Sequence, residues 1–180
     1  MIILEPIKTT HEDYPFIEEL FLSAFPDGER RELDQQRTNI DEDPRMQCLL
    51  IKEESDAKPV GFLTAWHFGK IVYLEHFAVS PSFRNKGLGG KALHIFMKYA
   101  TKPIVLEVEQ PTDSLSLRRV RFYESLDFKL WKNSTYVQPP YPGKEGLIPM
   151  MLMTYGAIRE EESFQDVKKL LYKEIYRYEN

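Results

Sequence analysis

Residues 73–93, YLEHFAVSPSFRNKGLGGKAL, combine an apolar run, a polar turn with three glycines and the start of an amphipathic segment. Residues 71–79 alternate as a strand does, and residues 86–100 carry apolar side chains at helical spacing. The turn at 84–91 therefore leads into a helix N-terminus, where unpaired backbone N–H groups and the helix dipole favour an anion. Glycines there let the backbone approach phosphate oxygens closely.

The charges around this turn support an anionic ligand. The chain has a formal net charge of −4, yet residues 80–102 hold five basic side chains and no acidic one. An acidic chain with one basic stretch is unlike a general nucleic-acid binder, so we expect a single anionic ligand and no nucleic acid. An ordinary helix start with solvated lysines and arginines is the simpler alternative.

Two other phosphate-binding motifs can be compared with the same residues. A P-loop requires Gly-x-x-x-x-Gly-Lys followed by Ser or Thr, and it fails here because Asn85 replaces the first glycine and Ala92 follows Lys91. The dinucleotide fingerprint fits better in spacing, with Gly87 and Gly89 followed by Ala92.

Two acids, Glu107 and Glu109, also follow the dinucleotide fingerprint at roughly 20 residues, where a ribose-binding acid would lie. Against it, the polar residues 80–86 separate the strand from the first glycine, and the strand has two polar residues at its centre. A dinucleotide-dependent oxidoreductase therefore stays as a lesser alternative.

Length and composition predict a single domain over residues 1–180, since 180 residues with 42% hydrophobic content suit one compact core. Cys48 is the one cysteine, which excludes an internal disulfide and a cysteine-based zinc cluster, and we expect no metal. No apolar run approaches the roughly 18 residues of a membrane span, and the first residues turn polar too soon for a signal peptide. We expect a cytoplasmic protein with no membrane contact.

The remaining elements follow from periodicity and turn residues. Strands are predicted at 2–4, 45–52, 59–68, 71–79, 104–108, 128–131 and 149–155, and helices at 11–25, 29–40, 86–100, 114–126 and 160–178. Residues 53–58 form the turn of a hairpin, and the three strands from 45 to 79 form an antiparallel meander. The fold class is therefore α/β (α+β), with a mixed central sheet and flanking helices. The apolar stripe of the last helix predicts packing against the body, and a homodimer contact is its alternative.

Residues 73–93 resemble the acetyl-CoA motif of the GNAT superfamily of N-acyltransferases. They contain the family's Arg-x-x-Gly-x-Gly at Arg84, Gly87 and Gly89. Residues 121–128, RFYESLDF, look like the Phe-Tyr-x-x-x-Gly-Phe helix end of these enzymes, with Asp127 in place of the glycine. The resemblance covers residues 1–155 and implies the GNAT fold, with 160–178 as an added C-terminal helix.

The resemblance implies an enzyme, a GNAT-type N-acetyltransferase. It would move an acetyl group from acetyl-CoA to a primary amine of a small molecule or peptide. The amine would attack the thioester directly, so Cys48 is not expected to act as a nucleophile. A non-catalytic acyl-CoA-binding or sensing module is the main alternative.

The resemblance also assigns the coenzyme contacts. The strand backbone at Phe77, Ala78 and Val79 would pair with the pantetheine arm. Ser116 lies where many members have an asparagine that holds this arm, and a serine replaces only part of that contact. The pyrophosphate would lie against the amides and charges of the turn, formed by Arg84, Asn85, Lys86, Gly87, Leu88, Gly89, Gly90 and Lys91.

Glu75 is the expected proton acceptor for the amine, directly or through water. An alkylamine with a pKa of about 10.4 is mostly protonated at pH 7, so a base must generate its neutral form. On a regular strand Glu75 shares a face with Phe77 and Val79, the side on which the resemblance puts the acyl group, while His76 faces the opposite way. A structural hydrogen bond is the alternative role for Glu75.

Tyr123 is the expected acid, since the resemblance puts its hydroxyl near the sulfur of the coenzyme. The leaving thiolate, with a model thiol pKa of about 8.5, benefits from a proton or a hydrogen bond. Packing in the core is the alternative role for Tyr123.

Two segments, 25–31 and 136–143, border the acceptor site in GNAT folds. Side chains with apolar faces and polar tips suit a pocket for a small molecule. The predicted acceptor contacts are Glu29, Arg30, Tyr136, Gln138 and Tyr141. A rigid proline turn without a contact role is the alternative for residues 136–143.

Overall fold

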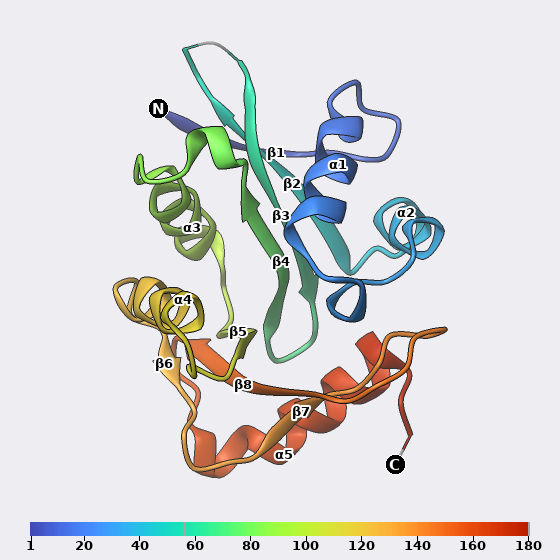
Figure 1. The fold of residues 1–180 in the computed structure, drawn as a ribbon, viewed down its shortest axis with the longest axis vertical. Helices are drawn as coiled ribbons and strands as arrows, with labels where there is room; N and C mark the ends of the chain where they lie inside the picture. The colour runs from blue at the N-terminus through green and yellow to red at the C-terminus, as the bar shows by residue number, and fades with distance from the viewer. Residues whose placement is uncertain (56, 180) are drawn as a thin grey trace. The chain divides into compact units, whose positions relative to one another are not determined.

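The computed structural model describes residues 1–55 and 57–179, which fold into two compact units (Figure 1). The first contains Met1–Pro26 and Glu32–Ile104, and the second contains Asp27–Arg31 and Val105–Asn180. The described residues form five α-helices and mostly antiparallel strands, so the predicted α/β class is confirmed. Among them, no helix combines the length and apolar character needed to cross a membrane.

The first unit contains an antiparallel sheet in the order β1-β2-β3-β4, which confirms the predicted meander. Its helices α1 and α3 lie on opposite sides of this sheet (Figure 1). The predicted turn at 53–58 includes Asp56, which lies outside the described residues. The elements are β1 (Ile2–Pro6), α1 (Tyr14–Ala24), α2 (Leu33–Glu42), β2 (Met46–Glu53), β3 (Pro59–His67), β4 (Val72–Val79), a 3-10 turn η2 (Pro81–Phe83) and α3 (Leu88–Tyr99).

Strand β4 has one residue more than β3 at its centre. Thr64 pairs with His76 and Ala65 pairs with Leu74, so Glu75 is left over between them. This is a β-bulge, in which an extra residue interrupts the alternation of side chains between the two faces of the sheet.

The bulge changes which side chains share a face. The His76 ring lies 4.9 Å from the Phe21 ring of α1, whereas Phe77 packs against the cluster that contains Leu88 of α3. Glu75 contacts His76, on the α1 side. The prediction that Glu75 shares a face with Phe77 while His76 faces away from it is therefore wrong, because strict alternation ends at the bulge.

The second unit arranges three strands in the order β5-β8-β6, and the short β7 also pairs with β8. The sequence predicted a loop where β7 lies. Helix α5 ends in a π-helical turn, η3, and α5 and η3 lie against β7 (Figure 1). The elements are η1 (Asp27–Glu29), β5 (Ile104–Glu109), α4 (Ser114–Glu124), β6 (Lys129–Leu130), β7 (Tyr136–Gln138), β8 (Ile148–Tyr155), α5 (Glu160–Leu171) and η3 (Tyr172–Tyr176). Because η1 comes first, α2 begins at Leu33 rather than at 29.

Gly61 allows β3 and β4 to approach each other at the end of the sheet. A Cβ atom at Gly61 would lie 2.4 Å from the carbonyl oxygen of Ala78 and 3.1 Å from the Cα of Val79. Both are backbone atoms, so Gly61→Ala should force the strands apart and lower the free energy of unfolding by about 1–3 kcal/mol in urea denaturation. Gly69→Ala is the control, because a Cβ there meets no atom within 4 Å, and a change within about 0.5 kcal/mol is expected. Equal effects of the two variants would contradict this account of the strand contact.

Candidate functional site

The turn between β4 and α3 has the backbone geometry of an anion site. Asn85 and Gly87 both have positive φ, 62° and 72°, and Gly87 is the N-cap of α3. Left-handed residues in such turns direct successive N–H groups toward one point and form a concave anion-binding nest. No side-chain hydrogen bond caps α3, so its first N–H groups are not used by a capping side chain.

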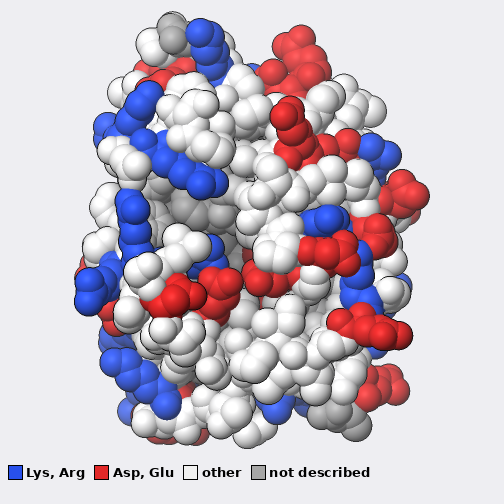
Figure 2. Space-filling view, viewed as in Figure 1, with Lys and Arg blue, Asp and Glu red and all other residues white. Residues whose placement is uncertain are grey.

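The space in front of this turn is open. A Cβ atom at Gly87 or at Gly90 would meet no atom within 4 Å. Figure 2 shows lysine and arginine side chains gathered over this part of the first unit, and the first turn of α3 contains no acid. Open space, a helix start without a capping side chain and positive charge together favour a ligand with several negative charges.

The basic side chains of the turn also contact the protein. Arg84 Nε donates to the carbonyl oxygen of Val79 at 3.0 Å and so holds the turn to the end of β4. Lys86 Nζ lies 5.1 Å from the centre of the Phe83 ring. Arg84, Lys86 and Lys91 are nevertheless exposed, and their charges are accessible to a ligand.

The Glu75 carboxylate is enclosed in the first unit. Its side chain has 0% exposure, and Trp66 Nε1 donates to its Oε2 at 2.8 Å. His76 Nδ1 lies 3.6 Å from the same oxygen and 3.3 Å from Thr64 Oγ1. These contacts favour the structural alternative for Glu75, and its role as a base stays a prediction that requires a water relay.

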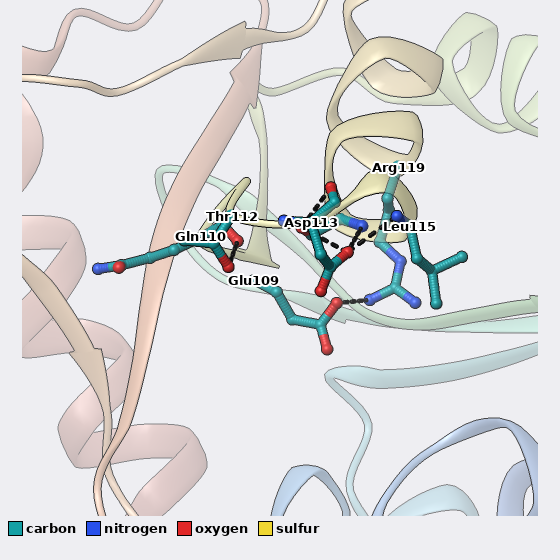
Figure 3. Close-up of polar contacts among 7 residues, drawn as sticks. Glu109, Gln110, Thr112, Asp113, Leu115 and Arg119 are labelled. Carbon is teal, nitrogen blue, oxygen red and sulfur yellow. Dashed lines mark hydrogen bonds and ion pairs between the residues drawn. The ribbon is translucent and has the colours of Figure 1, made fainter.

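Ser116 takes part in a capping box with Asp113, which is the N-cap of α4 and is labelled in Figure 3. The Asp113 carboxylate accepts from the N–H groups of Leu115 and Ser116 at 2.8 Å each, and the Asp113 N–H donates to Ser116 Oγ at 3.1 Å. Hydrogen bonds from Ser116 are the main cause that holds the pKa of Asp113 below its usual value. This cap was not predicted from the sequence, although Asp113 immediately before the helix is the residue type that signals an N-cap. The coenzyme contact of Ser116 stays a prediction.

The acids that a dinucleotide site would need are both engaged in the second unit. Glu109 Oε2 accepts from Arg119 Nη1 at 2.6 Å (Figure 3). Glu107 accepts hydrogen bonds from the hydroxyls of Tyr136 and Tyr176. This arrangement disfavours the dinucleotide alternative.

Tyr123 is buried in α4. Its ring packs edge-on against Phe128 with centroids 5.5 Å apart, and burial raises the pKa of Tyr123 to about 12. The phenol therefore stays protonated at neutral pH, as an acid must before it gives up its proton. The same position fits the packing alternative.

The second unit brings Asp27–Arg31 together with residues 136–143, both parts of the segments that were predicted to border the acceptor. Gln138 Nε2 donates to the Gly28 carbonyl oxygen at 3.1 Å, and the Arg31 guanidinium lies 4.9 Å from the centre of the Tyr141 ring. The predicted contacts Tyr136, Gln138 and Tyr141 are buried, whereas Glu29 and Arg30 are half-buried. Their roles in acceptor binding stay predictions.

Two groups outside these segments bear on the chemistry. Cys48 is buried in β2, and burial raises the pKa of its thiol to about 12, so it lacks the reactivity of a nucleophile. Over the part of the chain that the structure describes, no three His, Cys, Asp or Glu side chains are grouped to hold a metal ion.

A family profile and a solved structure both relate this chain to the GNAT family of acetyltransferases. The profile of the acetyltransferase (GNAT) family matches residues 14–128. A solved structure from Bacteroides thetaiotaomicron, assigned to the GNAT family of acetyltransferases, is similar with 35% sequence identity and a TM-score of 0.92. The match covers 98% of this chain and 99% of that chain, so it includes the C-terminal helix. No curated protein sequence matches the chain.

More distant structures share the fold. The ribosomal-protein-S18-alanine N-acetyltransferase of Escherichia coli has 20% identity and a TM-score of 0.62, over 88% of this chain and 99% of its own. NAA60 of Arabidopsis thaliana, solved in complex with acetyl-CoA, has 16% identity and a TM-score of 0.64, over 86% and 98%. These similarities confirm the expected architecture.

Proposed function

The chain belongs to the GNAT family of acetyltransferases, and on this premise we propose that it transfers an acetyl group from acetyl-CoA to a primary amine of a small molecule or peptide. The neutral amine nitrogen attacks the thioester carbonyl, the carbon–sulfur bond breaks, and an amide and the thiol of coenzyme A result. The nitrogen loses a proton and the sulfur gains one. The observation that carries the proposal is the turn before α3, with its positive φ at Gly87 and its open space at Gly90.

The residues of this turn fit the coenzyme. Its pyrophosphate requires several N–H donors and positive charge without a competing acid, and the start of α3 supplies both. Arg84, Lys86 and Lys91 would add charge, and the backbone at 77–79 would pair with the pantetheine arm. When bound, acetyl-CoA supplies the activated acetyl group. The proposal includes the cytoplasmic location that is expected from the sequence.

Two side chains of this chain are assigned to the protons. Tyr123, protonated because burial raises the pKa of its hydroxyl, would donate to the leaving sulfur. Glu75 would receive the proton of the amine through water, since its carboxylate is enclosed and bonded to Trp66. A non-catalytic acyl-CoA-binding module would bind the coenzyme but would carry out neither of these proton transfers.

Thermal unfolding with and without acetyl-CoA tests the coenzyme part of the proposal. At about 100 times its dissociation constant, acetyl-CoA should raise the Tm by about 5–10 °C, and NADH should not. Gly90→Ala is expected to keep or raise the Tm of the free protein, because alanine favours a helix and a Cβ there meets no atom within 4 Å. No shift with acetyl-CoA would refute the proposal.

Tyr123→Phe tests the assigned acid. Release of coenzyme A thiol across a panel of amines, followed with a thiol-reactive dye, should fall by about 100-fold or more in kcat while acetyl-CoA affinity is kept. Tyr155→Phe is a matched control, since the Tyr155 ring also packs on Phe128, at 5.6 Å, and no loss is expected. Unchanged turnover in Tyr123→Phe would remove Tyr123 from this role, and acetyl-CoA binding without turnover of any amine by the unmodified enzyme would favour the sensing module.

A further inference from the structure

The C-terminal helix ends in a π-helical turn whose tyrosines reach two strands of the same unit. The turn η3 follows α5 directly and ends at Arg177, which has a φ of 50°. The Tyr172 hydroxyl donates to the carbonyl oxygen of Val137 in β7 at 2.6 Å. The Tyr176 hydroxyl donates to Glu107 Oε2 in β5 at 2.5 Å. Such π-turns are frequent at functional sites, which makes this end of the chain a candidate for more than packing.

Glu107 connects the C-terminal turn to β7. Its Oε1 accepts from the Tyr136 hydroxyl and its Oε2 accepts from the Tyr176 hydroxyl, so both carboxylate oxygens are held by tyrosines. Burial, and then the nearby carboxylate, keep the pKa of Tyr136 well above its ordinary value, so Tyr136 remains a donor at neutral pH. The orientation of Glu107 therefore depends on hydroxyls from two separate elements.

The same contacts continue to the predicted acceptor segments. The Tyr176 ring lies 4.9 Å from the Tyr141 ring, and the Arg31 guanidinium lies over Tyr141. Gln138 of β7 donates to the Gly28 carbonyl oxygen. A series of direct contacts within the second unit therefore leads from η3 through residues 136–141 to Asp27–Arg31.

We propose that Tyr176, supported by Tyr172, is a positioning residue for the amine acceptor. It orients the Glu107 carboxylate and holds residues 136–141, which in turn hold Asp27–Arg31. This inference rests on the proposed function, because the acceptor is the substrate that these segments are assigned to bind. It gives the C-terminal helix a role that its apolar stripe alone does not require.

Removing one hydroxyl separates positioning from packing. Tyr176→Phe keeps the ring against Tyr141 and removes the hydroxyl that donates to Glu107. A role in packing alone predicts that the variant behaves like the unmodified enzyme. A role in positioning predicts weaker acceptor binding, because a carboxylate that loses a hydroxyl donor reorients.

Steady-state kinetics and hydrogen exchange test the proposal together. With the best acceptor of the amine panel, Tyr176→Phe should raise the acceptor KM about tenfold, and the acetyl-CoA KM should stay within about twofold. Tyr172→Phe should act in the same direction. In mass-spectrometric hydrogen exchange of the free enzyme, peptides covering 27–31 and 136–144 should exchange about tenfold faster in Tyr176→Phe, with the peptides of β2 and β3 unchanged.

Tyr178→Phe is the matched control. Its ring also packs on Tyr172, with centroids 5.7 Å apart, and neither its kinetics nor its exchange should change. The proposal is overturned if Tyr176→Phe matches this control, or if both KM values rise together. If the unmodified enzyme neither binds acetyl-CoA nor acetylates any amine, the proposed function fails separately. Unchanged hydrogen exchange at residues 136–144 in Tyr176→Phe would then also overturn the positioning role.

Discussion

The indole N–H of Trp66 donates to the carboxylate of Glu75, at the bulge in strand β4 of the first unit. A buried carboxylate requires such a donor, and the bond anchors the residue that β4 has in excess over β3. Because of that extra residue, His76 faces α1 and Phe77 faces α3. Phe77 packs against the cluster that contains Leu88, at the start of α3, beside the turn that is assigned to the coenzyme.

The sequence predicts the order of the elements because most of them have a clear period. The bulge in β4 could not be predicted in this way. Alternation of side chains along a strand does not reveal an extra residue, because the position of that residue depends on the pairing of β4 with β3. Strand β7 could not be predicted for a related reason. Its three residues directly precede a proline-rich segment, and they form a strand through pairing with β8, whose register is a property of the tertiary structure.

The candidate site also contains features that the sequence predicts and features that it does not. The glycine-rich turn is local, so Gly87 could be assigned from the sequence, and the structure gives it the left-handed conformation that glycine allows. The partners of Tyr136 are not local. Glu107 precedes it by 29 residues, and Tyr176 is a further 40 residues along the chain, so no motif joins them. The apolar stripe of the last helix could be predicted from the sequence. The hydrogen bonds of its tyrosine hydroxyls to β7 and β5 could not.

The central claim is that the start of α3 binds the coenzyme's pyrophosphate. Titration of the ¹⁵N-labelled protein with coenzyme A, followed by amide chemical shifts, tests it most directly. We expect saturable shifts that are largest for the amides of residues 85–91, because this turn leads into the N-terminus of α3, which no side chain caps. Shifts that leave this segment unchanged while the protein binds coenzyme A would contradict the account.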